Sequence, residues 1–105
     1  FVLTRSIRGV RAKGRVTFVN PMKTDLKKLF RPFRVVAVLG GAAAYQLMLD
    51  RGLMDEIFVT LEPLVFGRGI PMFTNGRKTR KLELVSIRKL NARGTLLLRY
   101  RILGR

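Results

Sequence analysis

The stretch that most constrains this sequence is a run of five apolar residues, Val35 to Leu39, followed by two glycines and three alanines. Such an unbroken apolar run suits a strand buried on both faces, as in a parallel sheet covered by helices. Gly40 and Gly41 would end that strand, and without Cβ atoms they allow a sharp turn and the close approach of another molecule. Ala42 to Ala44 would begin a helix whose free N–H groups favour an anion. The pattern predicts strand, turn and helix. It is not GxGxxG, and it leaves open whether the glycines serve packing or a ligand.

Length and composition set further bounds. The 105 residues suffice for one small domain with one core, and 48% of them are hydrophobic, which argues against a disordered chain. The sequence has no Cys and no His, which excludes disulfides, an ordinary zinc site and Ser/His or Cys/His dyads. No apolar run has the length of a membrane span and no signal-peptide pattern opens the chain, so we expect a cytoplasmic protein with no membrane partner. Phe1 falls within an expected strand, so we also expect that further residues of a longer domain precede it.

The charge is strongly basic. The chain has 22 Lys and Arg against 6 Asp and Glu, a formal net charge of +16. This predicts attraction to polyanions such as nucleic acid. The cations are spread along the chain instead of forming one tail, so the alternative interpretation is a general bias of the surface charge with a phosphorylated ligand bound locally.

Periodicity and turn residues predict alternating strands and helices. We expect one helix to open at Asn20-Pro21, with Asn20 as its cap, and to end by Pro32, and a second helix to run over residues 42–51. Residues 7–14 and the long connection that starts at Glu62 are expected to be irregular. Strands are expected at residues 1–4, 15–19, 35–39, 57–61, 82–89 and 95–103. The order implies right-handed parallel crossovers. The expected fold is therefore α/β, a mainly parallel sheet flanked by helices with a C-terminal antiparallel hairpin.

The first expected strand ends in the polar group Thr4-Arg5-Ser6. Arg5 is able to grip a phosphate with two hydrogen bonds and Ser6 to donate its hydroxyl, which are the elements of a phosphomonoester site. A solvated loop is the alternative interpretation of the same residues.

Several motifs, taken together, resemble the dihydrofolate reductase-like family, which includes the reductase domain of riboflavin biosynthesis. They follow the order of that family over nearly the whole chain: residues 3–6, 15–18 and 38–42, Tyr45, the Gly-Leu-x-Asp-Glu-Ile stretch at residues 52–57, Thr60, Pro63, and the Gly-x-Gly loop at residues 66–73.

The resemblance implies NADPH as cofactor. It implies that Thr4, Arg5 and Ser6 meet the adenosine 2′-phosphate. It assigns the pyrophosphate and nicotinamide to the turn and helix start, namely to Leu39, Gly40, Gly41, Ala42 and Ala43, with Tyr45 nearby. It further implies a cis peptide bond between Gly40 and Gly41. Thr60 matches a strand threonine that, in the folate-reducing members, belongs to the hydrogen-bond network around the substrate. The alternative is a threonine whose hydroxyl forms its hydrogen bonds within the sheet.

The departure from the family lies at the start of the chain, because the resemblance covers only the second half of the family's domain. The substrate-binding strand, the helix that shapes the active-site acid and further NADPH phosphate ligands have no counterpart before Phe1. Glu62 and the pair Asp55-Glu56 inherit no acid role from the resemblance. The catalytic residues are thus unknown, although residues 1–105 are expected to form a single domain.

Two functional hypotheses follow. The first is an NADPH-dependent reductase domain, or its cofactor-binding half, acting on a heterocyclic small molecule. Dihydrofolate and the pyrimidine phosphate of the riboflavin pathway are the substrate candidates, and a homodimer is compatible with this hypothesis. The alternative is a basic module on a reductase-like fold that binds RNA or works within a ribonucleoprotein.

Overall fold

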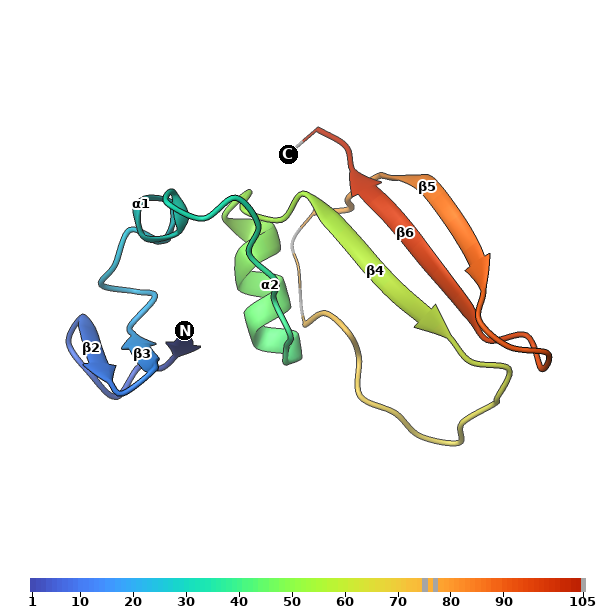
Figure 1. Ribbon diagram of the computed structural model, residues 1–105, viewed down its shortest axis with the longest axis horizontal. Helices are drawn as coiled ribbons and strands as arrows, with labels where there is room; N and C mark the ends of the chain where they lie inside the picture. The colour runs from blue at the N-terminus through green and yellow to red at the C-terminus, as the bar shows by residue number, and fades with distance from the viewer. Residues whose placement is uncertain (75, 77, 105) are drawn as a thin grey trace. The chain divides into compact units, whose positions relative to one another are not determined.

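The computed structural model describes residues 1–74, 76 and 78–104. The chain divides into two compact units, Phe1–Leu39 and Gly40–Arg105, and each is described by itself. Figure 1 shows the elements of both units along the chain.

The first unit contains a three-stranded sheet in the order β1-β3-β2. Strand β1 (Val2–Leu3) runs parallel to β3 (Val16–Val19), and β2 (Val10–Lys13) runs antiparallel to β3. A two-residue loop joins β2 to β3, and its first residue, Gly14, has φ +62°, as the tight turns of hairpins require. The sheet is therefore mixed, with β3 in its centre.

Helix α1 (Leu26–Phe30) follows that sheet and is short. Asp25 caps it, because its carboxylate accepts a hydrogen bond of 3.2 Å from the backbone N–H of Lys28. Leu26 is 1% exposed and Val19 of β3 is fully buried, so these two side chains form the centre of the first unit's core.

The second unit contains helix α2 (Ala42–Asp50) and an antiparallel sheet in the order β4-β6-β5. The strands are β4 (Glu56–Leu61), β5 (Leu82–Lys89), which carries a bulge, and β6 (Leu96–Ile102). Figure 1 shows the three as long neighbouring arrows. The buried apolar residues of this unit are Met48, Met54, Ile57 and Ile102.

The turn of the C-terminal hairpin is organised by one side chain. The Asn91 carboxamide oxygen accepts hydrogen bonds of 3.1–3.2 Å from the backbone N–H groups of Arg93, Gly94 and Thr95. Its amide nitrogen donates to the Thr95 hydroxyl at 2.8 Å. The Asn91 side chain thus accepts hydrogen bonds from backbone N–H groups that have left the strand ladder in this turn. This explains why Asn and Gly occur at the turn in the sequence.

The predicted fold class is wrong. In the residues that the structure describes there are two small sheets, one mixed and one antiparallel, and two short helices, instead of a parallel sheet flanked by helices. The predicted central strand does not form at Val35 to Leu39, where the first and last side chains are 81% and 90% exposed. A strand exists through pairing with neighbours, and the sheet of the first unit takes only β1, β3 and β2. The hairpin expected near the C-terminus is present as β5 and β6.

The expected helix start at Asn20-Pro21 is also wrong. Asn20 is 6% exposed, and its side chain accepts from the Met22 N–H at 2.9 Å while donating to the Ile7 carbonyl at 2.6 Å. The carboxamide therefore stabilises a turn and anchors the loop before β2, and α1 begins only at Leu26. The irregular loop expected over residues 7–14 instead contains β2, whereas α2 and β4 lie close to their predicted ranges.

Candidate functional site

The glycine turn before α2 is the best-defined candidate site. The peptide bond between Gly40 and Gly41 is cis, as predicted, and Gly40 has φ +106°. Gly41 takes the N-cap position of α2 in extended conformation, and its carbonyl accepts the first helical hydrogen bond, 3.0 Å from the N–H of Tyr45. The turn and the start of the helix are thus continuous.

Tyr45 closes one side of this turn. A Cβ atom added at Gly40 would lie 3.3 Å from the Tyr45 hydroxyl oxygen and 3.4 Å from Cζ. The Tyr45 ring in turn packs against Phe73, with centroids 5.9 Å apart and the planes tilted by 51°. Gly40 is therefore required for two local reasons, its positive φ and the phenol beside it.

Gly41 differs from Gly40, because a Cβ atom added there would meet nothing within 4 Å. The helix cap has no side-chain hydrogen bond, and the N–H groups of Ala42, Ala43 and Ala44 have no acceptor within the described part of the chain. Such groups at a helix N-terminus carry a partial positive charge. The turn therefore offers open space and free donors, the features that an anionic group bound close to the backbone needs.

Leu39 and the Thr4-Arg5-Ser6 cluster belong to the first unit. Leu39 is 90% exposed. The Thr4 and Ser6 hydroxyls share a hydrogen bond of 2.9 Å, and the Ser6 N–H donates to the Thr4 hydroxyl oxygen at 3.2 Å. The Thr4 N–H donates to the Val19 carbonyl at 2.8 Å, which fixes the cluster to the end of β1 beside β3. Two hydroxyls and the exposed Arg5 side chain thus share one short turn.

Thr60, in β4, was the remaining candidate, whereas Glu62, just after β4, was given no acid role. Thr60 is exposed, and its hydroxyl forms no hydrogen bond with any described residue. Glu62 accepts a hydrogen bond of 2.9 Å from the Thr95 hydroxyl, which joins the end of β4 to the start of β6. This contact gives Glu62 a structural partner.

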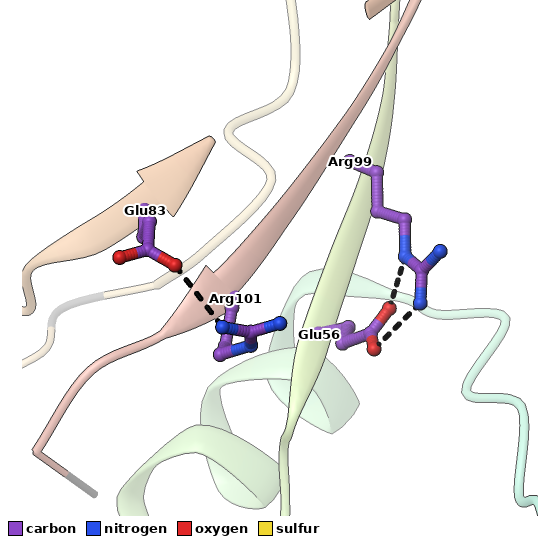
Figure 2. Close-up of polar contacts among 4 residues, drawn as sticks. All are labelled: Glu56, Glu83, Arg99 and Arg101. Carbon is purple, nitrogen blue, oxygen red and sulfur yellow. Dashed lines mark hydrogen bonds and ion pairs between the residues drawn. The ribbon is translucent and has the colours of Figure 1, made fainter. Parts of the chain in front are cut away.

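The sequence interpretation missed a polar pairing on the sheet. The Arg99 guanidinium donates two hydrogen bonds, of 2.5 and 2.8 Å, to the Glu56 carboxylate, and Arg101 donates one of 3.1 Å to Glu83. Figure 2 shows both pairs. The Arg99 guanidinium also lies 5.5 Å from the centroid of the Phe58 ring. The hydrogen bond from Arg99 lowers the pKa of Glu56, and the same bond raises the pKa of Arg99. A carboxylate held in this way is a poor proton donor, which argues against Glu56 as the missing acid.

The only sequence signal for this pairing was the alternation of Arg99 and Arg101 along β6. The partners lie 43 residues apart for Arg99 and 18 for Arg101, so the strand register was needed to match them.

Across the described residues, the structure contains no group of three His, Cys, Asp or Glu side chains able to hold a metal ion. Among the same residues, no helix is long and apolar enough to cross a membrane.

Comparison with known proteins identifies the family. The model of the RibD C-terminal domain matches residues 4–96. A curated relative, described as the uncharacterized protein YyaP of Bacillus subtilis (strain 168), is 27% identical over 74 residues. That match covers 70% of this chain and 36% of the relative, so the chain spans about a third of that protein's length. Since the family match covers most of the sequence, the chain belongs to the RibD C-terminal domain family, a dihydrofolate reductase-like family of riboflavin biosynthesis.

Proposed function

We propose that this chain is the NADPH-binding part of a reductase domain of the RibD C-terminal type. Residues 1–105 would belong to one such domain. The observation that carries the proposal is the glycine turn, where the open position at Gly41 adjoins the free N–H groups of Ala42 and Ala43. A cofactor pyrophosphate is an anion that such a turn would hold through backbone hydrogen bonds.

The second support is the cluster at the end of β1. Arg5 is exposed and has no ion-pair partner among the described residues, and Ser6 presents a hydroxyl in the same turn. A guanidinium and a hydroxyl are the groups that would recognise the 2′-phosphate, by which NADPH differs from NADH. The glycine turn is thus suited to the pyrophosphate and the turn with Arg5 and Ser6 to the 2′-phosphate, and each assignment is supported independently of the other.

The bound cofactor would supply a hydride to a heterocyclic substrate, and the protein would bind and orient both. The family favours the pyrimidine phosphate of the riboflavin pathway over dihydrofolate. Thr60 is available to contact the substrate, since its hydroxyl is exposed and forms no hydrogen bond with the described residues. No carboxylate described above suits the role of proton donor, because Glu56 and Glu62 are engaged with Arg99 and Thr95. We therefore expect the 105-residue chain alone not to turn over either substrate.

The test is a pair of binding titrations, with NADPH and with NADH, followed by the fluorescence of the reduced nicotinamide. Charge-assisted hydrogen bonds contribute about 1.5–3 kcal/mol each, so NADPH should bind more than about tenfold tighter than NADH. Arg5→Gln should remove most of this preference by weakening NADPH while leaving NADH nearly unchanged.

Arg34→Gln is the matched control, because it removes the same charge from an exposed arginine of the same unit. It should weaken both cofactors slightly through the general potential alone. Equal losses for NADPH and NADH in Arg5→Gln, or equal effects of the two variants, would contradict the assignment of Arg5.

A further inference from the structure

The first unit carries an unusual imbalance of charge. Residues 1–39 contain ten basic side chains and one acidic one, Asp25, whose carboxylate caps α1. The ten form no ion pair with any described residue, and all are exposed: Arg5, Arg8, Arg11, Lys13, Arg15, Lys23, Lys27, Lys28, Arg31 and Arg34. By contrast, two glutamates of the second unit pair with Arg99 and Arg101. The uncompensated charge is thus most concentrated in the first unit.

Two of these cations share one face of the mixed sheet with an aromatic ring. The register places Arg11 opposite Phe18 and Lys13 opposite Val16, so all four side chains project from the same face of β2 and β3. Val2 of β1 lies beside Phe18 on the other side, since β3 is the central strand. Phe18 is a half-buried residue of this central strand, and the register places it next to Arg11.

We propose that this face of β2 and β3 binds single-stranded nucleic acid, a role beyond the reductase function proposed above. Arg11 and Lys13 stand two residues apart on an extended strand, about 7 Å, and contact successive phosphates. Phe18 provides a surface on which a base stacks, and such stacking tolerates every base because each has a π-face. The binding is therefore weakly dependent on sequence and strongly dependent on salt.

An anionic membrane would also attract these cations, but the geometry favours nucleic acid. Binding in a membrane interface needs apolar side chains that enter the acyl region, usually from an amphipathic helix. Here the aromatic residue is half-buried within a sheet, the exposed apolar residues Val2 and Val16 on the same face have short side chains, and helix α1 has only five residues. A flat base reaches such a ring, whereas a lipid surface does not.

The test uses the full chain and a fluorescein-labelled oligouridylate of about twelve nucleotides, within the range of single-strand site sizes. Fluorescence anisotropy gives the binding constant at several salt concentrations between about 50 and 200 mM. The logarithm of that constant should fall with the logarithm of salt by about 0.7 per phosphate contacted. Replacing both cations, as Arg11→Gln with Lys13→Gln, should make that slope shallower by about 1.4.

The matched control is Arg88→Gln with Lys89→Gln, which removes the same charge from exposed neighbouring positions of β5 in the second unit. It should leave the slope unchanged. Phe18→Leu should weaken binding about fivefold or more without changing the slope, since it removes stacking but no charge. Circular dichroism checks that Phe18→Leu is folded. If it is not, the salt dependence of the two charge variants tests the proposal without it.

Three results would overturn the proposal. One is no measurable binding of the oligonucleotide at the lowest salt concentration. Another is an equal loss of slope in the two charge variants, which would mean that attraction is general and not localised on this face. The third is tighter binding to vesicles of phosphatidylserine and phosphatidylcholine than to the oligonucleotide, with the same dependence on Arg11 and Lys13.

Discussion

Replacing Gly40 by Ala should destabilise the second unit far more than the same replacement at Gly41, the next residue. The two glycines are neighbours in the sequence but differ in backbone conformation and surroundings. Gly40 has φ +106° and a Tyr45 ring within contact distance of its missing Cβ, whereas Gly41 has φ −76° and open space. The comparison therefore isolates what the local geometry demands.

The magnitude follows from these two features. A non-glycine residue held at such a φ costs about 1–3 kcal/mol. The added methyl would also lie 3.3 Å from the Tyr45 hydroxyl oxygen, so the ring must move by a few tenths of an ångström against Phe73. At Gly41 the entropy lost from the unfolded chain favours Ala by about 0.4–1 kcal/mol, offset by the weaker capping of Ala. We expect Gly41→Ala to be nearly neutral and Gly40→Ala to lose about 1–3 kcal/mol.

The assay is urea unfolding followed by circular dichroism, with thermal unfolding as a second measure. A loss of 1 kcal/mol moves the midpoint of a small domain by about 4–8 °C, so the difference is well resolved. Combining Gly40→Ala with Tyr45→Phe removes the closest oxygen but keeps the unfavourable φ, so most of the loss should persist. Equal stabilities of Gly40→Ala and Gly41→Ala would refute the reasoning, and full rescue by Tyr45→Phe would refute the dominance of φ.

Three further predictions concern packing, capping and pH. Leu26→Ala should lower the free energy of unfolding by about 2–5 kcal/mol, because the side chain is 1% exposed; urea unfolding beside exposed Lys27→Ala checks this. Asp25→Ala should cost about 0.5–2 kcal/mol through loss of the α1 cap, and Asn at the same position should restore most of it in the same assay. The hydrogen bond from Arg99 lowers the pKa of Glu56 in the folded chain. The pair therefore stabilises the fold at pH values above the ordinary pKa of a glutamate, about 4.3. This contribution is lost as the pH falls through the lower pKa that Glu56 has in the folded state. Unfolding midpoints across the acid range should therefore depend less on pH in Glu56→Gln than in the unchanged chain, and identical profiles would contradict the pairing.

Elements with local signals were predictable from the sequence. Helix α2 combines an alanine-rich start with Gly52, whose φ of +67° ends the helix, and neither feature depends on distant residues. The C-terminal hairpin is similar, because Asn91 and Gly94 supply its turn chemistry within four residues. The cis bond was expected from family resemblance alone.

Elements that depend on distant partners were not predictable. Asn20 has the sequence signals of a helix cap, yet the Ile7 carbonyl 13 residues away engages its side chain instead. The apolar run from Val35 to Leu39 signals burial, but a strand also needs neighbours, which sequence pattern does not supply. The bond from Arg99 to Glu56 likewise required the register of β4 and β6. Of the candidate site, the turn geometry and the Thr4-Ser6 hydrogen bond are visible in the structure, while their role toward a cofactor stays a prediction.

The most direct test of that role is a titration of the isotope-labelled chain with NADPH, followed residue by residue through backbone amide resonances. We predict saturable shifts at Gly41, Ala42 and Ala43, with a second set at Arg5 and Ser6 that adenosine 2′,5′-bisphosphate reproduces alone. Oligouridylate, in contrast, should shift the amides of β2 and β3. NADPH shifts that are absent from Gly41 to Ala43 at saturation, or that an equal concentration of inorganic phosphate fully reproduces, would contradict the account.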